Sequence, residues 1–145
     1  MAFKSIAIAA DHAGFDLKAK LADELKSAGY RVLDLGTDNG TTSVDYPDFG
    51  KAVAEAVVAG KADAGVIVCG TGIGISIAAN RHPGIRAALC HDVTMARLCR
   101  EHNDANVLAL GARLIGEAVA RDCLQAFLTT DFAGERHVRR IEKLG

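Results

Sequence analysis

The fold is decided by residues 66–80, VIVCGTGIGISIAAN. The stretch opens as a short apolar run with β-branched residues, passes through glycines at alternate positions and resumes as a helical pattern of small residues. This order predicts a buried parallel strand, a tight loop and the start of a helix. Unpaired N–H groups at a helix start stabilise negative charge, so Cys69 could carry thiolate character there. An equally good interpretation is that Cys69 is a buried packing residue in a tight turn.

The whole chain has 145 residues, is 50% hydrophobic and carries a formal net charge of −1. These values fit one globular domain over residues 1–145 and suggest no nucleic-acid partner. The start of the chain lacks the apolar region of a signal peptide, and no stretch approaches a membrane span, so we expect a cytoplasmic protein. The four cysteines contain no Cys-x-x-Cys pair, which favours neither a metal site nor a disulfide framework; Cys90, Cys99 and Cys123 are interpreted as packing thiols.

Outward from the central stretch, apolar runs alternate with helical patterns. Strands are predicted over 3–10, 31–35, 85–90 and 107–110, besides the central one. Helices are predicted for a segment with Leu17, Leu21 and Leu25 on one face, then over 48–59, from Asp92 to about 102, and over 134–144. Another helix carries Ile115, Val119, Cys123 and Phe127 at four-residue spacing, and 37–47 is predicted as a loop. The alternation predicts a single doubly wound, Rossmann-like α/β fold with a five-stranded parallel sheet and helices on both faces.

Polar side chains follow the strands or fall in the connections between them. Asp11 and His12 follow the first strand, Cys69 to Gly74 follow the third, and Tyr46 lies in a connection, as do His102, Asn103 and Arg113. Because ligands of such sheets bind outside the carboxyl ends of the strands, we expect these groups along one edge.

A thiol, imidazoles, a glycine loop and arginines suit proton transfer on a phosphorylated metabolite. In an aldose–ketose isomerisation a base moves a proton between adjacent carbons while donors hold the enediolate charge, and no metal or organic cofactor is needed. Arg136 and Arg140 are four residues apart and could clamp a phosphate together. A basic C-terminal helix is more often simply a solvated face.

Five blocks of sequence, in order, also carry a resemblance to a known family. They are 10–14 (ADHAG), 45–47 (DYP), 69–76 (CGTGIGIS), 102–108 (HNDANVL) and 134–137 (GERH) followed by Arg140. Together they resemble type B ribose-5-phosphate isomerase, of the ribose/galactose-6-phosphate isomerase family, over essentially the full length. The resemblance implies a dimer or tetramer with a cleft built from two subunits, so the implied partners are a phosphorylated sugar and a second copy of the chain.

The resemblance also implies roles for individual residues. Cys69 would be the base. One branch of the family uses a glutamate base instead of the cysteine, but the position of that glutamate corresponds here to Ile75, which cannot act as a base. His102 would assist ring opening, and Thr71 with the amides of the glycine loop would stabilise the enediolate. The remaining residues would bind the sugar and its phosphate: Asp11, His12, Tyr46, Gly70, Gly72, Gly74, Asn103, Arg113, Arg136 and Arg140. By the same resemblance, His137 would have a phosphate-side or a structural role.

Other functions remain open. Relatives with these motifs act on sugar phosphates of four, five or six carbons, so ribose 5-phosphate competes with a tetrulose 4-phosphate, allose 6-phosphate and galactose 6-phosphate. The glycine loop superficially resembles a dinucleotide-binding site, and Asp92, after the next predicted strand, could be its ribose-binding acid. The chain would then be a nucleotide-binding regulatory module. Cys69 and His102 could also form the nucleophile pair of a cysteine hydrolase.

Overall fold

The computed structural model describes residues 3–145 and contains a five-stranded parallel sheet. The strands are β1 (Ser5–Ala10), β2 (Arg31–Asp34), β3 (Ala64–Cys69), β4 (Ala87–Leu89) and β5 (Val107–Gly111), in the order β2-β1-β3-β5-β4. Met1 and Ala2, the first residues of the stretch considered as a signal peptide, lie outside the described residues. The predicted parallel sheet is confirmed.

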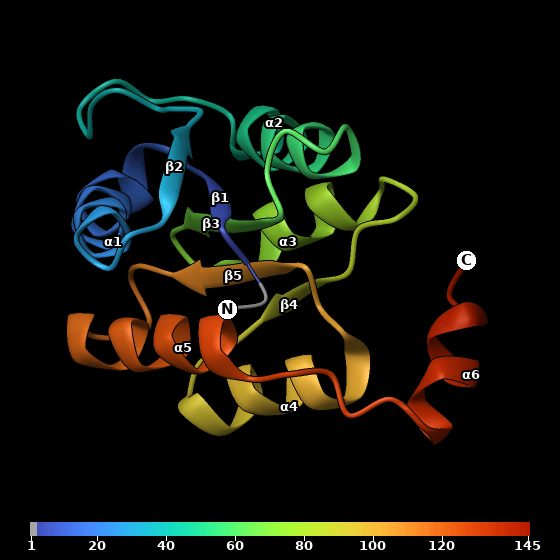
Figure 1. The fold of residues 1–145 in the computed structure, drawn as a ribbon. Coiled ribbons are helices and arrows are strands. Elements are labelled where there is room, and N and C mark those ends of the chain that lie inside the picture. Colours follow the sequence, from blue (N-terminus) through green and yellow to red (C-terminus); the bar gives the residue numbers. More distant parts are fainter. Residues whose placement is uncertain (1–2) are drawn as a thin grey trace.

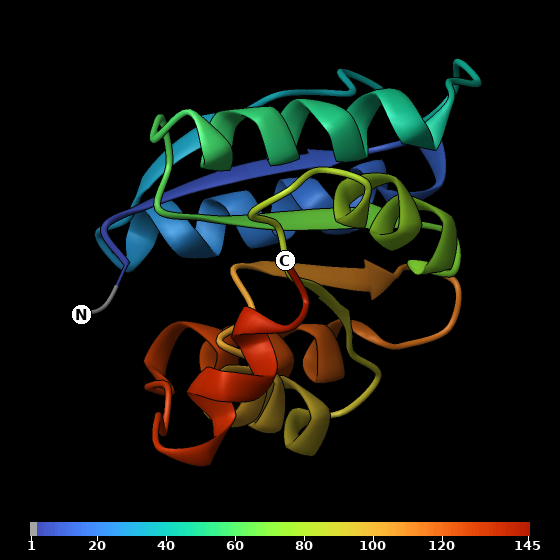
Figure 2. The same ribbon diagram turned by 90° about the vertical axis from the view of Figure 1, so that its right-hand side faces the viewer.

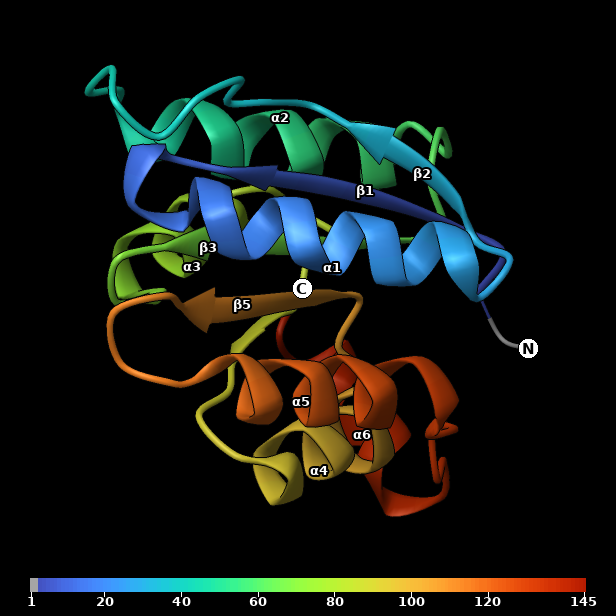
Figure 3. The same cartoon turned by 90° about the vertical axis from the view of Figure 1, so that its left-hand side faces the viewer.

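Helices cover both faces of this sheet. They are a 3-10 turn η1 (His12–Gly14), α1 (Phe15–Ser27), α2 (Tyr46–Val58), α3 (Ile73–Asn80), α4 (Val93–Asn103), α5 (Glu117–Thr129) and α6 (Arg136–Glu142). One buried apolar cluster joins α1, α4 and α5 to the sheet, and a second joins α2 and α3 to the opposite face. Figures 1 and 3 show the helices on the two faces, with α1 in front of the strands and α5 below β5 in Figure 3. The doubly wound arrangement is therefore confirmed.

Helix α6 lies outside these layers. It packs beside α4, on the part of the molecule away from α2 (Figure 2). None of the helices found over residues 3–145 combines the length and the apolar character needed to cross a membrane.

The observed element boundaries lie within about two residues of the predictions, and two of the differences have a local explanation. Helix α2 begins at Tyr46 instead of Asp48, because the fixed φ of Pro47 is compatible with the first turn of a helix and Asp45 is the last extended residue. Strand β4 has only three residues instead of six, because it is an edge strand paired with β5 alone. On its free side the Asn80 side-chain amide bonds both the N–H and the carbonyl of Ala87, at 2.8 and 2.9 Å. That amide takes the place of another strand.

The predicted apolar stripe of the fifth long helix is only partly right. Cys123 and Phe127 are buried, but Val119 is exposed and Ile115 precedes α5, which begins at Glu117. Residues four apart advance by about 40° around a helix, so a stripe with that strict spacing rotates away from the core over three steps. The core face is instead formed by Ala120, Cys123, Leu124, Phe127 and Leu128.

Candidate active site

Strand β3 ends at Cys69, and the chain turns at once into the loop that begins α3. The Cys69 side chain is buried, with 4% of its surface exposed. The backbone N–H of Gly72 donates to Sγ of Cys69 at 3.2 Å, and that of Ile73 donates to Oγ1 of Thr71 at 3.2 Å. The predicted strand, loop and helix start are confirmed, and they place a thiol beside backbone donors at a helix N-terminus.

Two glycines allow the loop to pack this closely. Gly72 has a φ of +77°, and a Cβ there would lie 2.5 Å from Cδ1 of Leu89 and 2.8 Å from the carbonyl carbon of Leu110. At Gly74 a Cβ would lie 2.5 Å from Cε1 of Tyr46, so the tyrosine ring lies directly on the first turn of α3. A side chain at either position would displace the loop or the ring.

Arg113 and Asp11 also lie at this edge. Nη1 of Arg113 is 3.3 Å from the point where a Cβ of Gly70 would be, so its side chain lies over the glycine loop. The backbone N–H of Asp11 donates to the carbonyl of Val68 at 3.2 Å, which places Asp11 next to the end of β3. Its buried carboxylate accepts from the N–H of Gly14 at 3.2 Å and caps the short turn η1.

His12 follows Asp11 and is fixed by a backbone donor. Its Nδ1 accepts from the N–H of Val44 at 3.1 Å, which leaves Nε2 as the free nitrogen of the ring. We call this group of side chains, at the carboxyl ends of the parallel strands, the carboxyl-edge cluster: Asp11, His12, Tyr46, Cys69, Thr71 and Arg113, with Gly70, Gly72 and Gly74.

The remaining predicted residues form a second group. His102 and Asn103 end α4, and Arg136 and Arg140 lie on α6. The ring of His102 stacks on that of His137, with centroids 4.5 Å apart and planes 14° apart. A cavity of about 310 Å³ is lined by His102, Asn103, His137, Arg140, Ile141 and Leu144. We call His102, Asn103, Arg136, His137 and Arg140 the amino-edge cluster.

The expectation that all of these residues share one edge is wrong for a single chain. Cys69 is level with Gly111 at the carboxyl end of β5, whereas His102 and Asn103 precede Val107, where β5 begins. The five residues of β5 alone span about 16 Å. One chain therefore carries two separate halves of the predicted site, on opposite edges of the sheet. A hydrolase pair of Cys69 with His102 does not form within one chain.

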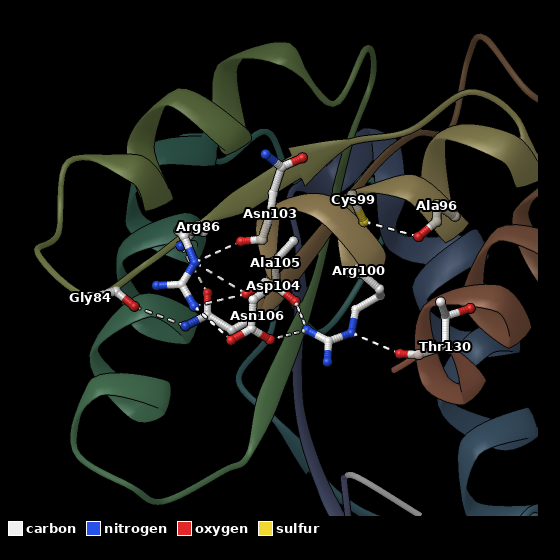
Figure 4. Close-up of polar contacts among 10 residues, drawn as sticks. All are labelled: Gly84, Arg86, Ala96, Cys99, Arg100, Asn103, Asp104, Ala105, Asn106 and Thr130. Atoms are coloured by element: carbon white, nitrogen blue, oxygen red, sulfur yellow. Dashed lines mark hydrogen bonds and ion pairs between the residues drawn. The ribbon is translucent and has the colours of Figure 1, made fainter. Parts of the chain in front are cut away.

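A pair of arginines holds the end of α4, where the amino-edge cluster begins (Figure 4). Asp104 has a φ of 45° and accepts from Nη1 of Arg100 at 2.9 Å and from Nη2 of Arg86 at 3.4 Å. Arg100 is buried, and its Nε also donates to the backbone carbonyl of Thr130 at 3.2 Å. Nε of Arg86 donates to the backbone carbonyl of Asn103 at 2.9 Å. These residues were not among the predicted site residues, although the four-residue spacing of Arg100 and Asp104 is typical of an ion pair on a helix.

Electrostatics in the amino-edge cluster favour neutral histidine. Burial lowers the pKa of His137, and the nearby positive charge of Arg136 lowers it further. A neutral His137 ring can stack on His102 without repulsion between two imidazolium charges.

The other cysteines lie in the core, as predicted. All four are free, and those other than Cys69 are buried among the helices α4 and α5 and the end of β4. Burial raises the pKa of Cys123 to about 11. The hydrogen bond with Cys99, together with burial, raises the pKa of Cys90. Both groups are therefore held as neutral thiols.

Asp92 has a structural partner. Its Oδ1 accepts from the N–H of Met95 at 2.8 Å and caps α4, as predicted. This geometry supports the interpretation of Asp92 as an N-cap and not as a ribose-binding acid. Among residues 3–145 no group of three or more His, Cys, Asp or Glu side chains is placed to hold a metal ion.

Comparison with known proteins supplies the family. The profile of the ribose/galactose isomerase family matches residues 6–144. The chain belongs to that family. Ribose-5-phosphate isomerase B of Escherichia coli is 44% identical over 97% of this chain and 94% of its own length. Isomerases of this family act on phosphorylated sugars, and the chain is an aldose–ketose isomerase of that kind.

Relatives with different substrates are about equally similar to the chain. The D-erythrulose-4-phosphate isomerase of Pectobacterium atrosepticum is 43% identical over 97% of this chain and 93% of its own. Among solved structures, ribose-5-phosphate isomerase B of Clostridium thermocellum is 55% identical and superposes with a TM-score of 0.96, covering 97% of this chain and 95% of its own. These similarities therefore establish the family but not the number of carbon atoms in the substrate.

Proposed function

We propose that the chain interconverts ribose 5-phosphate and ribulose 5-phosphate, with Cys69 as the base. The observation that carries this proposal is the placement of the Cys69 thiol beside the backbone donors of the glycine loop. A base next to preorganised N–H groups is the arrangement that enediolate chemistry needs. The relatives named ribose-5-phosphate isomerase, at 44% and 55% identity, support the five-carbon substrate.

The proposed reaction needs one base and one set of donors. The Cys69 thiolate removes the proton from C2 of the open-chain aldose, and the electron pair moves to the carbonyl oxygen to give an enediolate. Thr71 and the amides of Gly70, Gly72 and Gly74 hold the oxygen charge. A proton passes from O2 to O1 as the thiol returns its proton to C1, so that C2=O becomes the carbonyl of the ketose and the thiolate is restored. No atom is gained or lost.

The other residues would prepare and hold the substrate. His102 transfers the proton that opens the sugar ring, for which an imidazole is suited near neutral pH. Asp11 and Asn103 bind sugar hydroxyl groups. The phosphate is bound by His12, Arg113, Arg136 and Arg140, with Tyr46 against the glycine loop.

These roles require two copies of the chain. Cys69 and His102 lie on opposite edges of the sheet in one chain, so one chain does not place both at one substrate. We propose a homodimer, or a tetramer of such dimers, in which the amino-edge cluster of one copy faces the carboxyl-edge cluster of the other. In a two-fold symmetric pair this contact occurs twice and gives two complete sites.

The substrate is tested by ranking sugar phosphates. We expect the metal-free protein to turn over ribose 5-phosphate with a higher kcat/KM than allose 6-phosphate or a four-carbon ketose phosphate. Coupled assays of all three, run beside Cys69→Ala, measure this. A higher value for another sugar would replace the substrate and keep the mechanism, whereas turnover of none would overturn the proposal.

The phosphate role of α6 gives a separate prediction. Arg136→Ala and Arg140→Ala should each raise KM for ribose 5-phosphate by about tenfold, because each removes a charge-assisted hydrogen bond to the phosphate. The turnover number should change less, since the phosphate is distant from the reacting carbons. Arg139→Ala, on the same exposed helix, is the matched control and should leave KM unchanged. An unchanged KM in both variants would remove α6 from the phosphate site.

A further inference from the structure

Lys18 is a buried charge that the proposed mechanism does not use. It lies on α1, and only 2% of its side chain is exposed. Its Nζ donates to the two carboxylate oxygens of Asp34, at 2.8 and 3.2 Å, and to the backbone carbonyl of Thr37 at 2.7 Å. Because burying an ammonium group is costly without partners, this side chain is held in one place by strong bonds to β2 and to the segment after it.

Thr37, whose carbonyl accepts from Lys18, is itself hydrogen-bonded to Ala10, the residue before Asp11. The N–H of Ala10 donates to the carbonyl of Gly36 at 2.8 Å, and the N–H of Thr37 donates back to the carbonyl of Ala10 at 2.8 Å. Lys18 therefore fixes the segment that runs beside the last residue of β1. Asp11 and His12 follow directly.

The other end of the same loop holds His12. The loop runs from Thr37 to Val44, and the N–H of Val44 donates to Nδ1 of His12 at 3.1 Å. Between the two ends, Gly40 lies against the carbonyl of His12, since a Cβ there would be 3.6 Å from that oxygen. An Nδ1 that accepts from a backbone donor carries no proton, so the neutral ring has its proton on Nε2.

We propose that Lys18 is a positioning residue that sets the tautomer and orientation of His12 through the 37–44 loop. The anchored loop presents Val44 N–H to Nδ1, and this leaves Nε2–H as a donor toward the substrate. The inference rests on the proposed function, in which His12 binds the phosphate. We call the bonds of Lys18 to Asp34 on β2 and to the Thr37 carbonyl the anchor of the loop.

The first test observes His12 without substrate. In the intact protein at about pH 8, above the ordinary histidine pKa, ¹⁵N imidazole spectra should show His12 as the Nε2–H tautomer. The signal is assigned by its loss in His12→Asn. Lys18→Met, which keeps the length of the side chain without its charge, should give a mixture of tautomers. Lys20→Met is the matched control, because Lys20 lies on the same helix with an exposed side chain. A wild-type spectrum in Lys18→Met would overturn the proposal.

The second test is kinetic. Lys18→Met should raise KM for ribose 5-phosphate by about tenfold and change kcat less, since a phosphate donor is misplaced and the base is not. In a His12→Ala background the same substitution should raise KM no further. An equal rise in both backgrounds would show that Lys18 acts independently of His12 and would overturn the proposal.

Asp34→Asn guards against a variant that does not fold. Asp34 is 43% exposed, and the asparagine Oδ1 can still accept from Nζ of Lys18 beside the Thr37 carbonyl, so this change weakens the anchor by removing the counter-charge while the ammonium keeps its acceptors. A thermal melt shows whether the variant folds. The KM effect should go in the same direction and be smaller; an unchanged KM would contradict the anchor. A wild-type protein that turns over no sugar phosphate would overturn the proposed function, while the ¹⁵N spectra would still decide whether Lys18 sets the tautomer.

Discussion

Cys69→Ala is expected to lower kcat for ribose 5-phosphate by about a thousandfold or more, because it removes the base that we propose moves the proton between C1 and C2. Phosphosugar binding should be largely retained, since the loop amides and the arginines that hold the anion are unchanged. The fold should also be retained, because alanine keeps the Cβ and only a sulfur atom is lost. Steady-state kinetics, calorimetric titration of the phosphosugar and a thermal melt measure the three effects.

Cys123→Ala provides the control for loss of a buried sulfur. Cys123 is buried in α5 and belongs to the core cluster on the face away from α3. Its replacement should lower Tm, because it leaves a small cavity, and should leave kcat unchanged. Retained turnover in Cys69→Ala would reject Cys69 as the base. An equal loss of kcat in both variants would indicate a general packing effect.

The local features of the fold were predictable from short patterns. The 66–80 stretch becomes β3, the glycine loop and α3, and Asp92 caps α4 through its own side chain. Each of these depends on residues close in sequence: apolar period, glycine spacing and an N-cap. The boundary of α2 was missed by two residues because Pro47 was treated as the end of a loop and not as part of a first turn.

The placement of His102 and Asn103 was missed for a geometric reason. A residue at the end of a helix that leads into a parallel strand lies at the amino edge of the sheet. The two residues end α4, directly before β5, whereas Cys69 ends β3 at the opposite edge. The prediction of one shared edge overlooked this difference between strand-to-helix and helix-to-strand connections. The order in the sheet, with β5 between β3 and β4, depends on contacts distant in sequence and could not be read from local patterns.

Buried charges were the other features that local patterns did not reveal. Lys18 and Arg100 have the spacing of the buried faces of α1 and α4, but that spacing does not say which partners a charged side chain finds there. Apart from Asp104 and Ala105, which are close to Arg100 in sequence, their partners are a carboxylate on β2 and carbonyl groups of distant segments. Such partners become visible only when the chain is folded, although both residues hold segments that carry the candidate site.

The division of the candidate site between two edges leads to the second large expected effect, recovery of activity from two inactive variants. Cys69→Ala and His102→Asn should each be nearly inactive alone, since one lacks the proposed base and the other the proposed ring-opening imidazole. In a two-fold dimer that contains one chain of each kind, one site combines both substitutions. The other site combines the intact Cys69 of one chain with the intact His102 of its partner.

Hetero-dimers purified with two different affinity tags should therefore recover about half of the wild-type turnover per dimer, because one of the two symmetric sites is intact. The control pairs Cys69→Ala with Asp11→Asn, which both lie in the carboxyl-edge cluster. In that pairing each site keeps one of the two defects, so no recovery is expected. Recovery in the first pairing alone would require a substrate bound between the carboxyl edge of one chain and the amino edge of the other. The absence of recovery in both pairings would mean that the two clusters never meet at one substrate, and His102 would then lose its proposed role.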